Sequence, residues 1–171
     1  MDKCVIWTRV STQYQEENGG SLDTQKEKCI EFAKKNGYEI VGYFGGTHES
    51  AKAPGAMIKE MKKTLKRDRS IKYVIVNEID RYSRCAGQGI TMFNELLKCG
   101  VVIIEASSGL TTNDKNGRLM LGQKLLLAEW DNENRTDKFT EGRINCLKSG
   151  VYTGAVPLGY DKEGKSRNRT Y

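Results

Sequence analysis

The chain has 171 residues, of which 37% are hydrophobic and 29% are charged, and its formal net charge is +6. This length suits one domain with a sizeable core and an extension. No stretch approaches the roughly 18 consecutive apolar residues that mark a membrane-spanning helix, and the N-terminus lacks a signal-peptide pattern. We therefore expect a cytoplasmic protein without a membrane partner.

Four short apolar runs bounded by polar turns predict buried strands, over residues 4–7, 39–44, 73–76 and 101–106. Between them, apolar residues recur at helical spacing. The first helix is expected from Leu22, with Ser21 as its N-cap and Gly37 as its stop. Two more are expected over residues 57–65 and 90–97. This alternation predicts an α/β fold, a central and mostly parallel sheet with helices on both faces.

The pattern changes after the fourth strand, because residues 117–149 contain no proline and no strand signal. One helix over this stretch would be about 50 Å long, which exceeds the width of a domain of this size. Its first half is apolar and its second half is polar and basic. We expect dimerisation through the first half and a charged ligand along the second. Two helices broken near Gly122 or Gly142 are the alternative.

These patterns divide the chain into three parts. Residues 1–116 form the α/β core, residues 117–149 the long helix, and residues 150–171 a glycine-rich end with no room for a core. We interpret this end as a linker into a further domain, of which only the opening is present. From Arg135 onward, eight basic residues oppose four acidic ones. That excess suits a polyanion partner or a solvated tail equally well.

The cysteine and histidine content argues against disulfides and metals. The five cysteines are widely spaced and odd in number, which favours free, mostly buried thiols in a reducing compartment. His48 is the only histidine, so a zinc site is not expected. We expect no metal and no cofactor.

Polar side chains follow two of the predicted strands. Arg9 and Ser11 come after the first, and Asp80, Arg81 and Arg84 after the third. Ligand sites of open α/β sheets lie beyond the carboxyl ends of the strands. If the two strands are neighbours, three guanidiniums converge near one hydroxyl. Such a cluster matches phosphate oxygens and stabilises a phosphoryl transition state without a metal.

A structural interpretation of the same residues stands beside this one. Ser11 caps a turn in it, and Arg81 and Arg84 pair with Asp80 and Glu78. From the residues alone, the two interpretations are equally good.

The ordered motifs resemble the serine recombinases, the family of resolvases, invertases and integrases. They are "WTRVSTQ", "SLDTQKEKCIEFAKKNGYEIVGYF", "ESAK" and "NEIDRYSR". The later stretches "AEWDNENRTDKFTEGR" and "GVYTGAVPLGY" resemble the large members of that family. The resemblance covers essentially the whole chain and implies a resolvase-like catalytic domain, the N-terminal part of a large serine recombinase.

The resemblance implies a site-specific recombinase mechanism. Ser11 would attack a DNA phosphodiester and hold the 5′ phosphate as a phosphoserine ester. Strand exchange and religation would then need neither ATP nor metal. Asp80 would orient the phosphate-binding arginines and assist proton transfer. The implied catalytic residues are Ser11, Arg9, Asp80, Arg81, Arg84, Gln25 and Ser50.

The resemblance also implies partners. The long helix would build a dimer and a synaptic tetramer, and its basic end would cross double-stranded DNA. The DNA-binding residues expected there are Arg135, Lys138, Arg143 and Lys148.

Three departures from the family pattern leave other functions open. Gly46 stands where the family usually has an acid. The family also has an arginine a few residues beyond the position of Ser50, but residues 51–57 contain none here, and no arginine lies between Arg9 and Arg67. Lys52 is the nearest substitute. Asp137-Lys138 stands where Glu-Arg is usual. The main alternative is therefore a catalytically impaired resolvase-like module that binds DNA and assembles. A nicking enzyme and a flavodoxin-like domain for a small phosphate ligand are the others.

Overall fold

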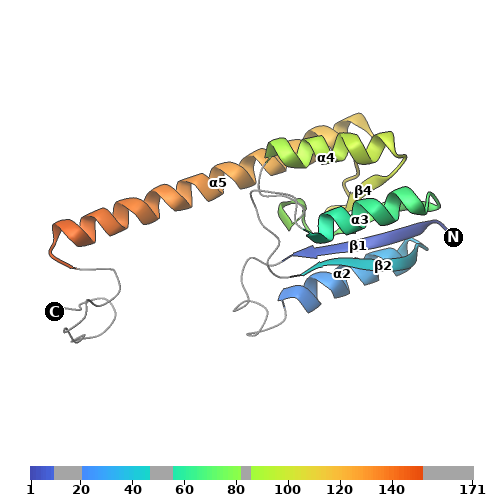
Figure 1. Ribbon diagram of the computed structural model, residues 1–171, viewed down its shortest axis with the longest axis horizontal. Helices are drawn as coiled ribbons and strands as arrows, with labels where there is room; N and C mark the ends of the chain where they lie inside the picture. Colours follow the sequence, from blue (N-terminus) through green and yellow to red (C-terminus); the bar gives the residue numbers. More distant parts are fainter. Residues whose placement is uncertain (10–20, 47–55, 82–85, 152–171) are drawn as a thin grey trace. The chain divides into compact units, whose positions relative to one another are not determined.

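The computed structural model describes residues 1–9, 21–46, 56–81 and 86–151 (Figure 1). The chain divides into two units, Met1–Glu129 and Trp130–Tyr171, and each is described by itself. In chain order, the elements are β1 (Lys3–Arg9), α2 (Ser21–Lys35), β2 (Glu39–Gly46), α3 (Ala56–Arg67), β3 (Ile71–Val76), the 3-10 turn η1 (Ile79–Arg81), α4 (Ala86–Lys98), β4 (Val102–Glu105) and α5 (Lys115–Lys148).

The four strands form one parallel sheet in the order β2-β1-β3-β4. In its register, Trp7 of β1 is opposite Val76 of β3, and Val76 is opposite Glu105 of β4. Parallel pairing requires crossover connections, which the helices between the strands provide. The carboxyl ends of β1, β3 and β4 therefore meet at one edge of the sheet, and the predicted α/β fold is confirmed.

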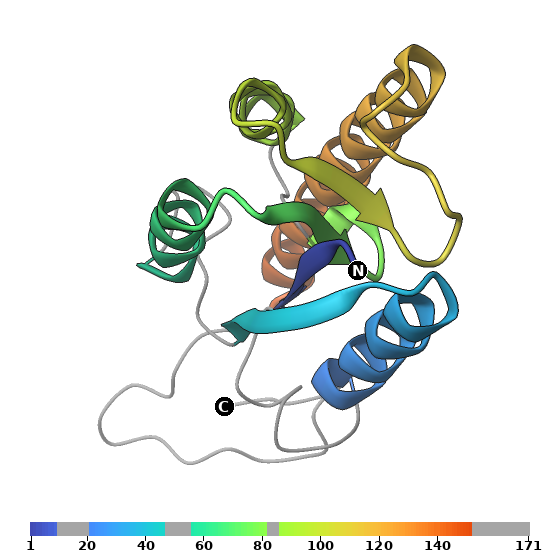
Figure 2. The same cartoon turned by 90° about the vertical axis from the view of Figure 1, so that its right-hand side faces the viewer.

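Helices cover both faces of the sheet (Figure 2). On one face, α2 packs Cys29 and Ala33 against Cys4, Ile6 and Ile75. On the other, α3, α4 and the start of α5 enclose a larger core, whose fully buried members include the residues Val5, Trp7, Met61, Val74, Ile103, Leu121 and Leu125. Alternate residues of β1 thus face opposite layers, as the period of two of a strand requires.

α5 is one helix of 34 residues, so the alternative of two helices is wrong. Asp114 is its N-cap, since its Oδ1 accepts a hydrogen bond from the Gly117 N–H at 2.6 Å. A Cβ at Gly117 would lie 2.0 Å from the Thr111 carbonyl oxygen. The close approach of the helix start to the preceding turn therefore requires glycine at this position.

The predicted elements differ from the observed ones mainly at their ends. β1 continues to Arg9 and β2 to Gly46, each two residues beyond its last predicted residue. α2 begins at Ser21 itself, so Ser21 is a helical residue and not the residue before the helix. Ile90, expected on the inner face of α4, is 37% exposed.

The described cysteines differ in burial. Cys4 and Cys29 are buried free thiols, Cys99 is exposed and Cys146 is half-buried. No helix within the described ranges is both long enough and apolar enough to cross a membrane.

Candidate active site

The ends of β1 and β3 are neighbours, which was the condition for a site at this edge. Arg9 closes β1, and η1, with Asp80 at its centre, begins three residues after β3 ends. The Arg9 Nη2 donates a hydrogen bond to the Asp80 carbonyl oxygen at 2.8 Å. The side chain of the first motif is thus fixed on the backbone of the second, although 71 residues separate them.

Arg9 is only 4% exposed, an unusual setting for a guanidinium. Such a buried cation is tolerated where hydrogen-bond acceptors or an anion compensate for its lost hydration. The Asp80 carbonyl oxygen is one of these acceptors. Since the planar guanidinium also matches the geometry of phosphate oxygens, a buried arginine at a strand end suits an anionic substrate.

Gln25 of α2 holds the main chain of Arg9. Its Oε1 accepts a hydrogen bond from the Arg9 N–H, and its Nε2 donates one to the Arg9 carbonyl oxygen, both at 3.3 Å. The 5% exposed carboxamide therefore satisfies both polar groups of one peptide residue, as a neighbouring strand would. This contact fixes the chain two residues before Ser11 in the sequence.

Two glycines of β2 lie beside the end of β1. Gly45 is opposite Thr8, and Gly46 is opposite Arg9. Gly45 has a φ of 106°, and a Cβ there would lie 1.8 Å from the Thr8 carbonyl oxygen. The Gly45-Gly46 pair thus ends β2 in close contact with β1, at the position where the sequence lacks the expected acid.

The structure describes only part of the expected catalytic set. It brings together Arg9, Gln25 and Asp80, and it places the Arg81 backbone in η1 without describing its side chain. Ser11, Ser50 and Arg84 lie outside the described residues. The convergence of three arginines on Ser11 stays a prediction.

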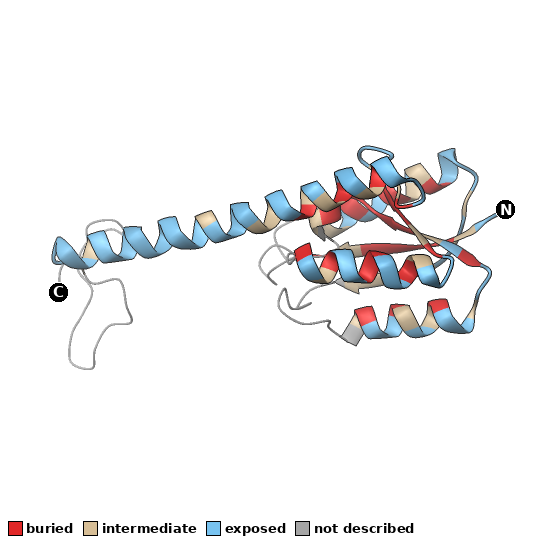
Figure 3. Cartoon of the chain, turned by 90° about the horizontal axis from the view of Figure 1, so that it is seen from above, coloured by how far each residue is buried: buried red, intermediate tan, exposed pale blue. Residues whose placement is uncertain are grey.

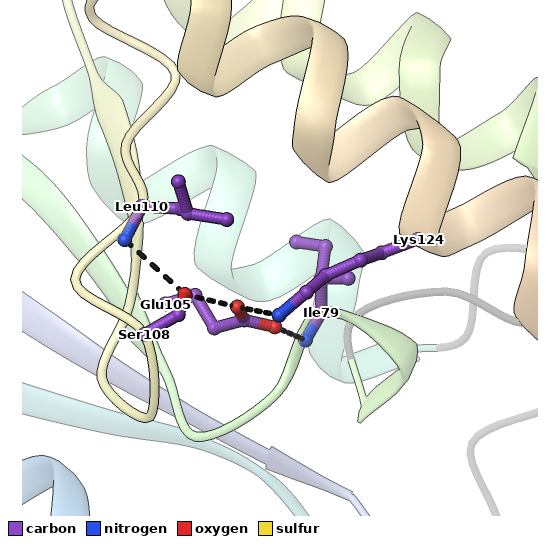
Figure 4. Close-up of polar contacts among 5 residues, drawn as sticks. All are labelled: Ile79, Glu105, Ser108, Leu110 and Lys124. Carbon is purple, nitrogen blue, oxygen red and sulfur yellow. Dashed lines mark hydrogen bonds and ion pairs between the residues drawn. The ribbon is translucent and has the colours of Figure 1, made fainter.

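Sequence reasoning missed Glu105, the last residue of β4. Its carboxylate is 1% exposed, and it contacts η1, the following turn and α5 (Figure 4). The available signal was one acid directly after the apolar run at residues 101–104. A charge at the end of a buried strand requires hydrogen-bond or ionic partners, but the amino-acid sequence does not reveal which residues these are.

The basic residues expected to bind DNA lie on α5 in the second unit. Arg135, Lys138, Arg143 and Lys148 are all exposed. At 3.6 residues per turn, the first three fall within an arc of roughly 140° around the helix, whereas Lys148 falls outside it. The Arg143 guanidinium lies over the Phe139 ring, 6.0 Å from its centroid. This side of the helix therefore presents three cations together.

Two surface hollows of the described residues do not contain Arg9 or Asp80. The larger, of about 500 Å³, is lined between α3 and α4 by Lys62, Lys66 and Lys98 among others. The second, of about 410 Å³, is lined by Lys28 and Lys35 of α2 and by Asn77 and Ser107. Within the described ranges, no three histidine, cysteine or acidic side chains cluster as metal ligands.

Comparisons with known proteins relate this chain to one family. The family model for the resolvase N-terminal domain matches residues 4–152. A relative from Bacillus subtilis (strain 168), which carries the name of a DNA recombinase, is 27% identical over 150 residues. That match includes 85% of this chain but only 28% of the relative, so the chain spans less than a third of its length.

Two solved structures resemble the chain. The crystal structure of a resolvase family site-specific recombinase from Streptococcus pneumoniae matches with a TM-score of 0.60 and 30% identity, over 86% of this chain and 99% of the other. The N-terminal catalytic domain of TP901-1 integrase also has a TM-score of 0.60, at 22% identity over 77% and 97% of the two chains. At that identity, the second likeness is one of fold.

Proposed function

The chain belongs to the resolvase family, the serine recombinases, and from this premise we propose that it cleaves and rejoins DNA through a phosphoserine intermediate on Ser11. One observation supports this site above all. The Arg9 guanidinium, buried at the end of β1, is hydrogen-bonded at 2.8 Å to Asp80 in η1, so the two motifs of the proposed site meet. Family membership supports the reaction class, and this contact supports the proposed location of the site.

In the proposed cleavage step, the Ser11 Oγ attacks the phosphorus of a DNA phosphodiester. The bond from phosphorus to the 3′ oxygen breaks, and that oxygen leaves as a 3′ hydroxyl after taking up a proton. The Ser11 proton is lost as the ester forms, with Asp80 assisting. Because the phosphoserine ester conserves the bond energy, a 3′ hydroxyl can later attack it and release Ser11 without ATP or metal.

The arginines stabilise the charge on the phosphoryl group in this mechanism. The equatorial oxygens accept hydrogen bonds from the planar guanidiniums of Arg9, Arg81 and Arg84. These hydrogen bonds stabilise the transition state most when the donors are held in place before the reaction. Gln25 fixes the Arg9 main chain, and Asp80 fixes the Arg9 side chain. Ser50 completes the proposed site.

The long helix has two proposed partners. In the first unit, Gly117, Leu121 and Leu125 are buried, whereas four large apolar residues lie exposed on the opposite side of α5. They are Leu119, Met120, Leu126 and Leu127. We assign this second apolar side to contacts with further copies of the chain, as a dimer and a synaptic tetramer.

Double-stranded DNA is the second proposed partner. Arg135, Lys138 and Arg143 share one side of α5 and would neutralise phosphates there, with Lys148 making a separate contact. Residues 1–116 are then the catalytic core, residues 117–149 the assembly and DNA-crossing helix, and residues 150–171 a linker toward a DNA-binding region.

The test is cleavage of supercoiled DNA carrying the junctions of the element that encodes the protein, stopped with detergent. We expect Ser11→Ala to abolish protein-linked breaks while DNA binding persists. Ser70→Ala is the matched control, because the hydrogen bonds that the structure describes for Ser70 are local ones to Asp68, before β3. It should cleave as the wild type does.

The alternative is a catalytically impaired module that binds DNA and assembles. The absence of any arginine between Arg9 and Arg67 favours it, since lysine cannot reproduce a bidentate arginine contact. In that case, the wild type and Ser11→Ala would bind DNA alike, and neither would produce a break.

A further inference from the structure

Glu105 and Lys124 join α5 to the catalytic turn η1, and we propose that they are positioning residues that make DNA cleavage depend on α5. The inference rests on the proposed function for its cleavage readout. Neither residue belongs to the proposed catalytic set. Both lie in the first unit, where their contacts are described.

Glu105 is the centre of this network (Figure 4). Its Oε1 accepts a hydrogen bond from the Ile79 N–H at 2.8 Å, at the first residue of η1. Its Oε2 accepts hydrogen bonds from the Ser108 hydroxyl and from the Lys124 ammonium group. With 1% exposure, the carboxylate depends on these partners in place of water.

Lys124 is the contribution of α5 to the network. It forms a salt bridge with Glu105. In the sequence it stands between Leu121 and Leu125, whose side chains are fully buried in the core. Its own side chain is 42% exposed, so the ammonium group reaches the buried carboxylate from the protein surface. Removing one partner of such a pair leaves the other charge buried and uncompensated. A movement of α5 that withdraws Lys124 therefore changes what holds Glu105.

The network continues from Glu105 to Arg9. The Ile79 N–H fixes the start of η1, and the next residue, Asp80, accepts the hydrogen bond of the Arg9 guanidinium through its carbonyl oxygen. The path from α5 to the buried arginine thus consists of Lys124, Glu105, the η1 backbone and Arg9. It is contiguous and polar, and hydrogen-bond and salt-bridge chains of this kind can carry coupling between two sites.

A second contact from α5 supports the same role. The Glu129 Oε2 accepts a hydrogen bond from the Ala86 N–H at 3.3 Å, at the first residue of α4. A carboxylate there also interacts favourably with the positive end of the helix dipole. α5 therefore holds the start of η1 through Glu105 and the start of α4 directly.

The arrangement gives α5 two tasks on neighbouring sides, since Lys124 lies roughly 40° around the helix from Met120. One side carries the exposed apolar residues that we assign to partner contacts, and the side next to it is joined to the catalytic turn through Lys124. A partner that shifts α5 would thereby shift η1 and Arg9. Assembly and cleavage would be coupled through one carboxylate, with the coupling free energy set by how differently the two arrangements of α5 hold Glu105.

The test compares four variants of the chain. Lys124→Met removes the cation, Lys124→Arg retains it, and Glu105→Gln removes the charge while keeping an acceptor for the Ile79 N–H. Lys62→Met is the matched control, because Lys62 of α3 and Glu95 of α4 form another lysine–glutamate pair, at 2.6 Å, away from η1.

The first readout is amide hydrogen exchange by NMR, which does not require cleavage. We expect Lys124→Met and Glu105→Gln to accelerate exchange of the Ile79 amide by on the order of tenfold, with core amides of β1 unchanged. In Glu105→Gln the cause is that a neutral amide oxygen accepts the Ile79 N–H bond less strongly than a carboxylate. Lys124→Arg and Lys62→Met should leave the Ile79 amide as in the wild type. Unchanged Ile79 exchange in Lys124→Met would overturn the coupling, whether or not the protein cleaves DNA.

The second readout is single-turnover cleavage at saturating DNA. A misplaced catalytic group costs on the order of 10- to 100-fold in rate, and we expect this loss in Lys124→Met with unchanged DNA affinity and rescue in Lys124→Arg. An equal loss in Lys62→Met would mean that general destabilisation is the cause, and would overturn the proposal. If the wild type itself forms no break, the proposed function fails, while the Ile79 exchange still decides the coupling.

Discussion

The two parts of α5 share one backbone helix but differ in what surrounds them. Over residues 115–129, Gly117, Leu121 and Leu125 are buried, and Lys124 and Glu129 contact other elements. Over residues 130–148, no residue is buried, and the exposed fractions of Phe139 and Leu147 are 67% and 55% (Figure 3). The first part is stabilised by its own domain, whereas the second relies on local helix energetics and, in our account, on DNA.

This difference teaches that helix length and helix stability have separate causes here. The exposed apolar and basic side chains along several turns of α5 contribute little to folding, and in our account they contact partners. The predictions below compare the two parts directly.

Matched leucines should give the largest contrast. Leu125→Ala removes a fully buried side chain and should lower the free energy of unfolding by roughly 2–5 kcal/mol. Leu147→Ala, in the exposed part, should change it by no more than about 0.5 kcal/mol. Urea denaturation of the two variants measures both. Equal losses would mean that the second part of α5 is packed as tightly as the first.

Two glycines of α5 should respond with opposite signs. Gly117→Ala forces a Cβ against the Thr111 carbonyl oxygen and should cost about 1–3 kcal/mol. Gly142→Ala meets nothing within 4 Å, and its gain in helix propensity should stabilise this part by about 0.5–1 kcal/mol. Thermal unfolding followed by the helical circular dichroism signal measures the change in stability of both variants. Stabilisation by Gly117→Ala would refute the close approach at the helix start.

The cysteine thiols of β1 and α2 are buried, whereas that of Cys146 in α5 is half-buried. Burial raises the pKa of the Cys4 thiol to about 11, and burial together with Cys4 raises that of Cys29 to about 12, from 9.0. The unfolded chain therefore loses these protons at lower pH than the folded chain. Their contribution to stability is complete below about pH 9 and is lost as the pH rises toward about 12.

Alkylation at about pH 8 tests the burial that raises these pKa values, since the thiolate is the reactive form. Half-buried Cys146 of α5 should be labelled in the folded protein, and Cys4 and Cys29 only after unfolding. Rapid labelling of Cys29 without unfolding would contradict the burial of the α2 face.

Basic residues should give the smallest single effects. Arg135→Ala, or Lys138→Ala, should reduce the slope of log affinity against log salt by about 0.9, the value for one phosphate contact. Lys115→Ala is the control, because Lys115 is an exposed cation at the other end of the same helix. A slope that changes as much for Lys115→Ala would place the DNA elsewhere.

The strands and helices were largely predictable because their periods are local properties. The runs that predicted β1 and β2 needed no knowledge of the rest of the chain, and neither did the long pattern that became α5. The sheet order was less accessible, since the position of β1 between β2 and β3 follows from pairing across the whole chain.

The candidate site was predictable only where one strand end carried the signal. Arg9 ends β1 and Asp80 comes shortly after β3, and both were predicted as site residues. The need for glycine at position 45 comes from Thr8 of another strand. Glu105 was missed because its partner Lys124 lies 19 residues away, at no spacing that a motif would reveal. Ile90 fits the apolar spacing of α4 and is nevertheless exposed, because the inner face of that helix is filled by Met92, Phe93 and Leu96.

The central claim is that Ser11 becomes covalently joined to DNA. The most direct measurement is mass spectrometry of tryptic peptides after reaction with junction DNA, a detergent stop and nuclease digestion. We predict a nucleotide remnant on Ser11 that is absent from Ser11→Ala. DNA bound without any adduct under every trapping condition would contradict the account and favour an assembly module without catalysis.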